Sequence, residues 1–215
     1  MQYGSELRAN IFLLSSMQIL DKDIRGAIFR RYRDAKRKVL GTVYTTFAFL
    51  YAKCMGVTLG QNVRFFGKVT FDRCPNSQIT IGDNCFFISS CQMNQLCYKS
   101  TILRTSTPVA KIEIGNNCGF SSVRIVSEAG VKIGDHVSIG ANTVIYDTDG
   151  HAEITGNQPK PIVIEDDVFI GMDCRILKGV RIGKGSIIGA CSVVTKDIPE
   201  GVIAAGVPCK VIREK

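Results

Sequence analysis

The sequence predicts a mainly β fold: a triangular parallel β-helix of about six coils with about 18 residues each, preceded by an N-terminal α-helical segment. Three observations lead to this prediction. Apolar residues recur with a step of six, glycine follows many of them directly, and small or β-branched residues occupy a second fixed phase. Because six residues make one strand and one corner, three such units close a triangular coil.

The predicted organisation has three parts. Residues 1–56 form a basic helical segment, residues 57–198 form the β-helix with a protruding loop at 146–163, and residues 199–215 form a C-terminal cap and tail. A hydrophobic content of 45% and a charged content of 21% are those of an ordinary globular protein. These values exclude a disordered chain.

The N-terminal segment is predicted to be an amphipathic helix, because its apolar residues recur at positions 24, 28, 32, 35, 39, 43, 47 and 50. Residues 1–56 hold ten Lys or Arg and four acids. A basic amphipathic helix can lie on an anionic membrane surface, where it would suit a lipid-linked acceptor. The alternative is a helix packed on the main domain with a solvated basic back. Nothing in the segment indicates a nucleic-acid partner.

No targeting segment or membrane span is expected. The apolar residues 11–20 follow Glu6 and precede no small-x-small cleavage site. The stretch from Val39 to Ala52 is shorter than the roughly 20 residues that a spanning helix needs. We therefore expect a cytoplasmic protein, which its basic helix can place at the inner face of the membrane.

The six-residue step defines the coils. Upstream it appears in groups of three that begin at Leu59, Ile81, Ile114 and Ile133. In the last third of the chain it runs without a slip through Ile164, Ile170, Ile176, Ile182, Ile188 and Val194. A sustained repeat of this kind is typical of a solenoid whose coils bury the same row of side chains.

Glycine and cysteine mark two further rows. Glycine directly follows the apolar residue at positions 60, 82, 115, 134, 140, 171, 183 and 189, which indicates a repeated corner. The second inward row includes Cys85, Cys91, Cys118 and Cys174, which we interpret as packing residues. Nine Cys without a CxxC pair argue against a disulfide framework or a structural zinc site, and favour a reducing compartment.

Two interruptions break the pattern. Residues 146–163 form a predicted loop that holds His151, flanked by Asp147 and Asp149. Residues 94–113 break the register more mildly, and we interpret them as an irregular coil without chemistry. The chain's other histidine, His136, occupies a predicted corner and is expected to be solvated.

Residues 57–213 resemble the hexapeptide-repeat acyltransferases. The resemblance is most specific in "PIVIEDDVFIGMDCRILKGVRIGKGSIIGACSVVTKDIPEGVIAAGVPCKVIREK". Within that family the chain is most similar to maltose and galactoside O-acetyltransferases, and "IGNNCGFSS" and "IYDTDGH" also resemble acetyltransferases of surface-polysaccharide clusters. The resemblance implies a left-handed parallel β-helix, although the general rule for parallel crossovers predicts the opposite hand.

The resemblance also implies the chemistry. The expected activity is acetyl transfer from acetyl-CoA to a sugar hydroxyl, with His151 as the general base that takes the hydroxyl proton. Asp147 or Asp149 would orient the imidazole. The open alternative is that both acids lie in water, in a "DTDG" turn.

The remaining expected contacts concern the substrates. Ser121 stands where galactoside-type members have an acceptor-binding Asn, and Asn117 is a neighbouring candidate. Met172 replaces a common Ser next to a cofactor position. The positions that match the family's acetyl-CoA contacts are Gly171, Ala190, Thr195, Lys196, Lys210 and Arg213, with the basic residues facing phosphates. No metal is expected.

Assembly and alternative functions complete the expectations. The family implies a homotrimer with active sites between subunits, acting on a sugar or polysaccharide acceptor. An N-acetyltransferase of an amino sugar and a non-catalytic scaffold remain open alternatives. The zinc-dependent γ-class carbonic anhydrases have a similar fold, but they need three histidine ligands and this chain has two histidines.

Overall fold

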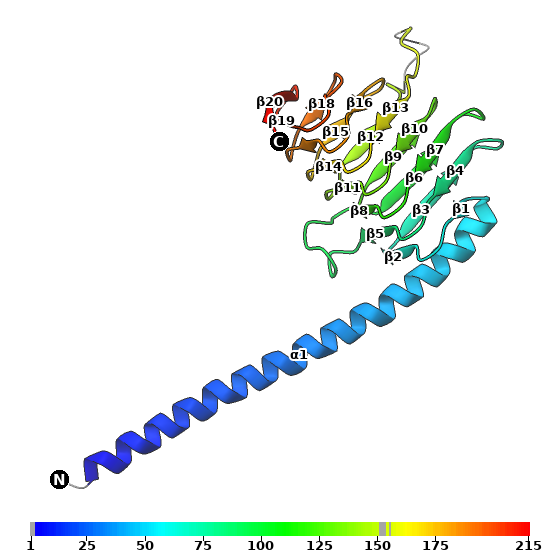
Figure 1. Ribbon diagram of the computed structural model, residues 1–215. Coiled ribbons are helices and arrows are strands. Elements are labelled where there is room, and N and C mark those ends of the chain that lie inside the picture. The colour runs from blue at the N-terminus through cyan, green and yellow to red at the C-terminus, as the bar shows by residue number, and fades with distance from the viewer. Residues whose placement is uncertain (1–2, 151–153, 155) are drawn as a thin grey trace. The chain divides into compact units, whose positions relative to one another are not determined.

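A computed structural model describes residues 3–150, 154 and 156–215. One helix, α1 (Tyr3–Met55), precedes the strands (Figure 1). The chain divides into two compact units, residues 1–39 and residues 40–215. The second unit therefore contains the last turns of α1 together with every strand, whereas the sequence predicted a boundary at residue 56.

Three sheets form the sides of the coil. Sheet A consists of β1 (Thr58–Leu59), β4 (Gln78–Ile81), β7 (Lys111–Ile114), β10 (Val131–Ile133), β13 (Ile162–Ile164) and β16 (Arg181–Ile182). Sheet B consists of β2 (Arg64–Gly67), β5 (Phe86–Ser89), β8 (Gly119–Ser121), β11 (Ser138–Ile139), β14 (Phe169–Ile170), β17 (Ile187–Ile188), β19 (Val202–Ala205) and β20 (Lys210–Glu214). Sheet C consists of β3 (Val69–Arg73), β6 (Thr101–Thr105), β9 (Arg124–Ser127), β12 (Val144–Tyr146), β15 (Arg175–Ile176) and β18 (Val193–Val194).

From β1 to β18, successive strands enter sheets A, B and C in turn, so each of them pairs with the strand one coil away (Figure 1). All pairings in the described residues are parallel except that of β20, which returns antiparallel to β19 at the C-terminal end. The predicted fold class, a mainly β parallel helix with an N-terminal helical segment, is confirmed.

The core consists of inward rows that run along the coil axis. In sheet B the row begins with three stacked rings, Phe65, Phe87 and Phe120, whose centroids are 5.1 Å and 4.8 Å apart. It continues through Ile139 and Ile170, and all five side chains are almost fully buried. The row therefore changes from aromatic to aliphatic as the coils proceed from the helix end.

The predicted six-residue register is wrong in two coils. Leu103 and Ile125 are the buried residues of β6 and β9, whereas Ile102 and Val126 are only half-buried. Leu96, which the register placed inside, is 52% exposed. Extra residues before β6 and one residue fewer before β9 shift the phase by one. Because side chains alternate along a strand, a shift of one turns them to the other face.

The glycine row between sheets A and B reflects close stacking of the coils. A Cβ at Gly115 would lie 2.6 Å from the carbonyl oxygen of Gly134 in the next coil. Two positions later the backbone is left-handed, and there Asn117 and His136 have φ of 57° and 58°. His136 is exposed, as predicted. The left-handed conformation thus falls on residues such as Asn, and the glycines make room for the backbone.

The cysteine row is partly as predicted. Cys85, Cys118 and Cys174 are buried, whereas Cys91 is exposed in the segment that breaks the repeat. All nine cysteines are free thiols in the structure.

The last turns of α1 pack on the first coil through small residues. Ala48 and Ala52 are buried, and a Cβ at Gly41 would lie 2.7 Å from the ring of Phe66. The Tyr51 hydroxyl donates to the carbonyl oxygen of Phe71 at 2.7 Å. This part of the helix therefore packs on the main domain, but not through the apolar face that the sequence predicted. No helix in the described part of the chain has the length and hydropathy that crossing a membrane requires.

The aromatic stack gives a stability prediction. Phe87→Ala removes the central ring of the sheet B row, and we expect the free energy of unfolding to fall by about 3–5 kcal/mol. Phe86→Ala is the matched control, because the neighbouring ring is 43% exposed, and we expect a loss of about 1 kcal/mol. Urea denaturation measures both; equal losses would contradict the assigned register.

Candidate functional site

The main interruption of the coil lies at the corner between sheets C and A. It follows β12 and rejoins the coil at β13, so the segment leaves and returns at one corner. His151, the predicted general base, lies outside the described residues, and its role stays a prediction. The structure does describe the residues at which this loop begins and ends, which we call the neck (Asp147–Gly150 and Gln158–Pro161).

Asp147 anchors the neck to the preceding coil. Its carboxylate is fully buried and accepts four hydrogen bonds at 2.6–2.9 Å. The donors are the Ser127 hydroxyl and the backbone amides of Glu128, Ala129 and Gly130. These donors compensate the carboxylate for its lost hydration. The alternative that Asp147 lies in water is therefore wrong.

The other acid of the neck has a different environment. Asp149 is exposed, and its Oδ2 lies 2.5 Å from Nζ of Lys178. Between the two acids, the Thr148 hydroxyl donates to a carboxylate oxygen of Glu128 at 2.9 Å. The returning strand closes the neck, because the amide of Lys160 donates to the carbonyl oxygen of Asp147 at 2.9 Å. Both ends of the loop are thus fixed at one place on the rigid coil.

A second set of predicted residues lies at the corner between sheets B and C. Gly171 is buried, and a Cβ there would lie 2.5 Å from the amide nitrogen of Ala190 in the next coil. Gly140 and Gly189 stand in the same column, which ends at Ala205. Along this column the successive coils therefore stack without glycine side chains between them. The half-buried Met172 follows Gly171 at this corner.

The basic residues predicted for acetyl-CoA divide into two groups. Lys210 pairs across the β19–β20 ladder with Ala205, so it continues the column between sheets B and C. Arg213 lies farther along β20, opposite Ile203. Thr195 and Lys196 follow β18 and lie at its far end, toward sheet A. All four side chains are exposed, and the structure brings only Lys210 close to the column.

The acceptor candidates do not share a corner. Ser121 ends β8 at the corner between sheets B and C, whereas the exposed Asn117 lies before β8, between sheets A and B. Ser121 is half-buried, and its hydroxyl accepts a hydrogen bond from the Asn94 side chain at 3.3 Å. Their roles in acceptor binding stay predictions.

A second loop, Ser90–Ser100, extends over this corner and was missed by the sequence analysis. The buried Asn142 holds it: its side-chain amide donates to the carbonyl oxygen of Leu96 at 2.9 Å and its oxygen accepts from the amide of Tyr98 at 3.3 Å. The sequence analysis interpreted residues 94–113, which include only the later part of this loop, as an irregular coil.

Tyr98 is the most prominent side chain of this second loop. Its ring is 67% exposed, and its hydroxyl donates to Asp173 Oδ1 at 3.0 Å. This hydrogen bond raises the pKa of Tyr98 above its ordinary value. The ammonium of Lys99 lies 5.1 Å from the ring centroid. Loop Ser90–Ser100 thus presents an exposed aromatic ring and a cation beside Ser121.

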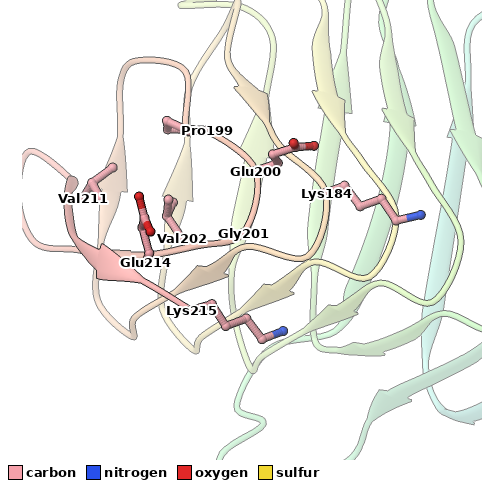
Figure 2. Close-up of a pocket in the computed structure, with 8 residues that line it drawn as sticks. All are labelled: Lys184, Pro199, Glu200, Gly201, Val202, Val211, Glu214 and Lys215. Carbon is pink, nitrogen blue, oxygen red and sulfur yellow. The ribbon is translucent and has the colours of Figure 1, made fainter.

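A hollow of about 610 Å³ lies near the C-terminal end of the coil (Figure 2). Figure 2 shows that its charged side chains are Lys184, Glu200, Glu214 and Lys215. None of the predicted site residues lines it. In the described part of the chain, no group of three or more His, Cys, Asp or Glu is arranged to hold a metal ion.

Two segments of the chain match family models. Residues 161–196 match the bacterial transferase hexapeptide model, described as six repeats. Residues 111–147 match the hexapeptide repeat of succinyl-transferase. Both segments belong to the stacked coils, and they lie on either side of the loop at 146–163.

Known proteins share parts of the sequence and the fold. The galactoside O-acetyltransferase of Escherichia coli (strain K12) is 45% identical over 111 residues, which are 49% of this chain and 55% of that enzyme. The chain thus spans about half the length of this curated relative. A point mutant of AntD, an N-acyltransferase of Bacillus cereus, superposes with a TM-score of 0.61 at 22% identity, over 77% of this chain and 88% of AntD.

A further solved structure is the polySia-specific acetyltransferase NeuO. It superposes with a TM-score of 0.51 at 26% identity, over 74% of this chain and 75% of NeuO. The repeat matches, the galactoside relative and the shared coils agree with one another. Residues 111–147 and 161–196 are therefore similar to the hexapeptide repeats of bacterial transferases, and the shared coils are consistent with a left-handed parallel β-helix.

Proposed function

We propose that the protein transfers an acetyl group from acetyl-CoA to a sugar hydroxyl in the biosynthesis of a surface polysaccharide. The observation that supports this most is the loop at 146–163, whose neck is fixed to a rigid coil by the buried Asp147. Identity to the galactoside O-acetyltransferase supports transfer to a sugar hydroxyl. The likeness to NeuO, a polySia-specific enzyme, supports a polysaccharide acceptor.

The chemistry needs a base and a thioester. Acetyl-CoA supplies the acetyl group as a thioester. The acceptor oxygen forms a bond to the thioester carbonyl carbon while the imidazole of His151 takes the hydroxyl proton. The carbon–sulfur bond then breaks, and the imidazolium returns the proton to the departing sulfur. An imidazole suits this task because its ordinary pKa lies near neutral pH.

The column between sheets B and C fits acetyl-CoA by its shape. Gly140, Gly171 and Gly189 carry no side chain at this corner, and we propose that an extended pantetheine arm lies along it. Lys210 stands at the end of this column and would face phosphate groups of the nucleotide. We keep Thr195, Lys196 and Arg213 as proposed contacts, although they lie away from the column.

The acceptor is proposed to bind between the two loops. Ser121 and Asn94 can hydrogen-bond sugar hydroxyls, and the exposed ring of Tyr98 offers an apolar face for a sugar ring. The neck of the His151 loop and Ser121 lie at opposite edges of sheet C. This separation supports the proposal of a homotrimer in which neighbouring subunits complete the site.

The general base gives the first functional prediction. We expect His151→Ala to lower acceptor-dependent thiol release from acetyl-CoA by a factor of about 10²–10⁴. His136→Asn is the matched control, because His136 is exposed and Asn tolerates its left-handed backbone, so full activity is expected. The assay uses a panel of sugars, nucleotide sugars and polysaccharide fragments.

The outcomes of this assay separate the candidate functions. A product that survives mild alkali would indicate an amide and therefore an N-acetyltransferase. If no acceptor promotes thiol release and acetyl-CoA does not raise the melting temperature, the protein is a non-catalytic scaffold. Equal activity of His151→Ala and the native protein would overturn the proposed base.

The neck gives the second prediction. In Asp147→Asn the new amide NH₂ would face backbone N–H donors, and we expect the free energy of unfolding to fall by about 2–4 kcal/mol. Asp149→Asn changes an exposed ion pair, for which we expect a loss of about 1 kcal/mol or less. If Asp147 also orients His151, its variant will additionally shift the pH profile of kcat. Equal melting temperatures for the two variants would contradict the anchoring role.

The acetyl-CoA groove gives the third prediction. Cys191 is exposed and adjoins Ala190, so bound acetyl-CoA should shield its thiol. At a concentration of ten times Kd we expect alkylation of Cys191 to slow by about tenfold. The exposed Cys54 on α1 is the internal control and should react at an unchanged rate. Peptide mapping by mass spectrometry measures both thiols, and unchanged labelling of Cys191 would place acetyl-CoA elsewhere.

A further inference from the structure

The last turns of α1 carry apolar side chains that the described residues leave largely exposed. Phe47 is 67% exposed, Leu50 is 59% exposed and Val43 is 44% exposed. Intervals of three and four residues place one set of side chains on one side of the helix: Leu40, Val43, Tyr44, Phe47, Leu50 and Tyr51. We call this set the aromatic face. A contiguous exposed patch of this kind marks an interaction site.

The aromatic face is exposed because the helix packs through a different side. Gly41, Ala48 and Ala52 make the contact with the first coil. Small residues allow the helix backbone to approach closely, so the larger side chains beside them remain outside. Tyr51 also holds the helix in place through its hydrogen bond to Phe71.

The first coil extends this apolar surface into a groove. A hollow of about 750 Å³ lies between the aromatic face and residues 67–70 of the first coil. Lys68 is the only charged residue along its lining, and its side chain is exposed. The groove is thus lined mainly by apolar and aromatic side chains, with one lysine at its edge.

The stretch of sequence that forms the groove is rich in basic residues. Between Asp34 and Asp72 the sequence has no acidic residue. The same stretch contains six basic residues: Lys36, Arg37, Lys38, Lys53, Arg64 and Lys68. Lys53, Arg64 and Lys68 belong to the unit that contains the groove, and all three are exposed. The surface is therefore apolar, aromatic and positively charged.

This combination selects the partner. In a two-fold contact between copies of the chain, the same patch would meet itself and bring basic residues against basic residues. An anionic lipid surface instead accepts apolar and aromatic side chains at its interface and attracts lysine and arginine. We infer that the aromatic face, together with the basic residues Lys53, Arg64 and Lys68, docks the protein on an anionic bilayer. The docking is peripheral and leaves the coils in water, where a lipid-linked sugar acceptor can meet them.

Vesicle binding tests this inference. The full-length protein is sedimented with vesicles of phosphatidylcholine alone and of phosphatidylcholine with about one third phosphatidylglycerol. We expect binding only to the anionic vesicles and a decrease with added salt. Tyr44→Ser combined with Phe47→Ser should lower the apparent affinity at least about tenfold, because two aromatic side chains no longer enter the interface.

Two further variants serve as comparisons. Phe169→Ser removes an aromatic side chain of similar exposure, 49%, from the outer face of sheet B and should bind as the native protein does. Lys68→Glu should weaken binding to anionic vesicles. Acetyl transfer to a soluble acceptor should be unchanged in the Tyr44→Ser, Phe47→Ser variant. Vesicle binding needs neither acetyl-CoA nor an acceptor, so failure of the proposed function would not affect this test.

Two results would overturn the inference. One is equal vesicle binding by the native protein and the Tyr44→Ser, Phe47→Ser variant. The other is a change of sedimentation coefficient of that variant without lipid, which would identify the aromatic face as a contact between subunits.

Discussion

Direct stacking of each coil on the next is the constraint on which the structure depends. At Gly171 an added Cβ would lie 2.5 Å from the next coil's backbone, so the corner has no space for a side chain. Equal spacing of the coils also aligns the inward rows, including the stacked rings of Phe65, Phe87 and Phe120. One requirement, close repetition of the backbone, thus fixes both the glycine rows and the core.

The same constraint decides where chemistry can be placed. Strand residues are committed to ladders, so additional residues can leave the coil only at a corner. Each of the two loops is held there by a buried polar side chain, Asp147 for the loop at 146–163 and Asn142 for Ser90–Ser100. They lie on either side of sheet C. The rigid coil thereby holds the ends of both loops in fixed positions. Loops held in this way on a rigid scaffold are suited to forming a binding site.

The first coil shows how packing of small residues determines an outer surface. Gly41, Ala48 and Ala52 of α1 pack on the first coil and cover the end of the core. The larger aromatic side chains of the helix therefore face outward. In a protein without a lipid partner such a face would favour aggregation. The exposed basic residues Lys53, Arg64 and Lys68 of the same unit suit an anionic surface.

The sequence by itself determined the β-helix, the N-terminal helix and the loop at 146–163, because the six-residue step reports inward rows directly and any long insertion must leave the coil. It also predicted the hexapeptide repeats, which family models match at residues 111–147 and 161–196. Only the tertiary structure showed that Asp147 is buried and not in water, because its four donors come from residues 127–130, on the preceding coil. The same holds for the second loop, whose tie to Asn142 joins residues 46 positions apart. The tertiary structure also decided which side of α1 is buried. The apolar periodicity of the helix cannot distinguish a face that packs on protein from a face that stays exposed.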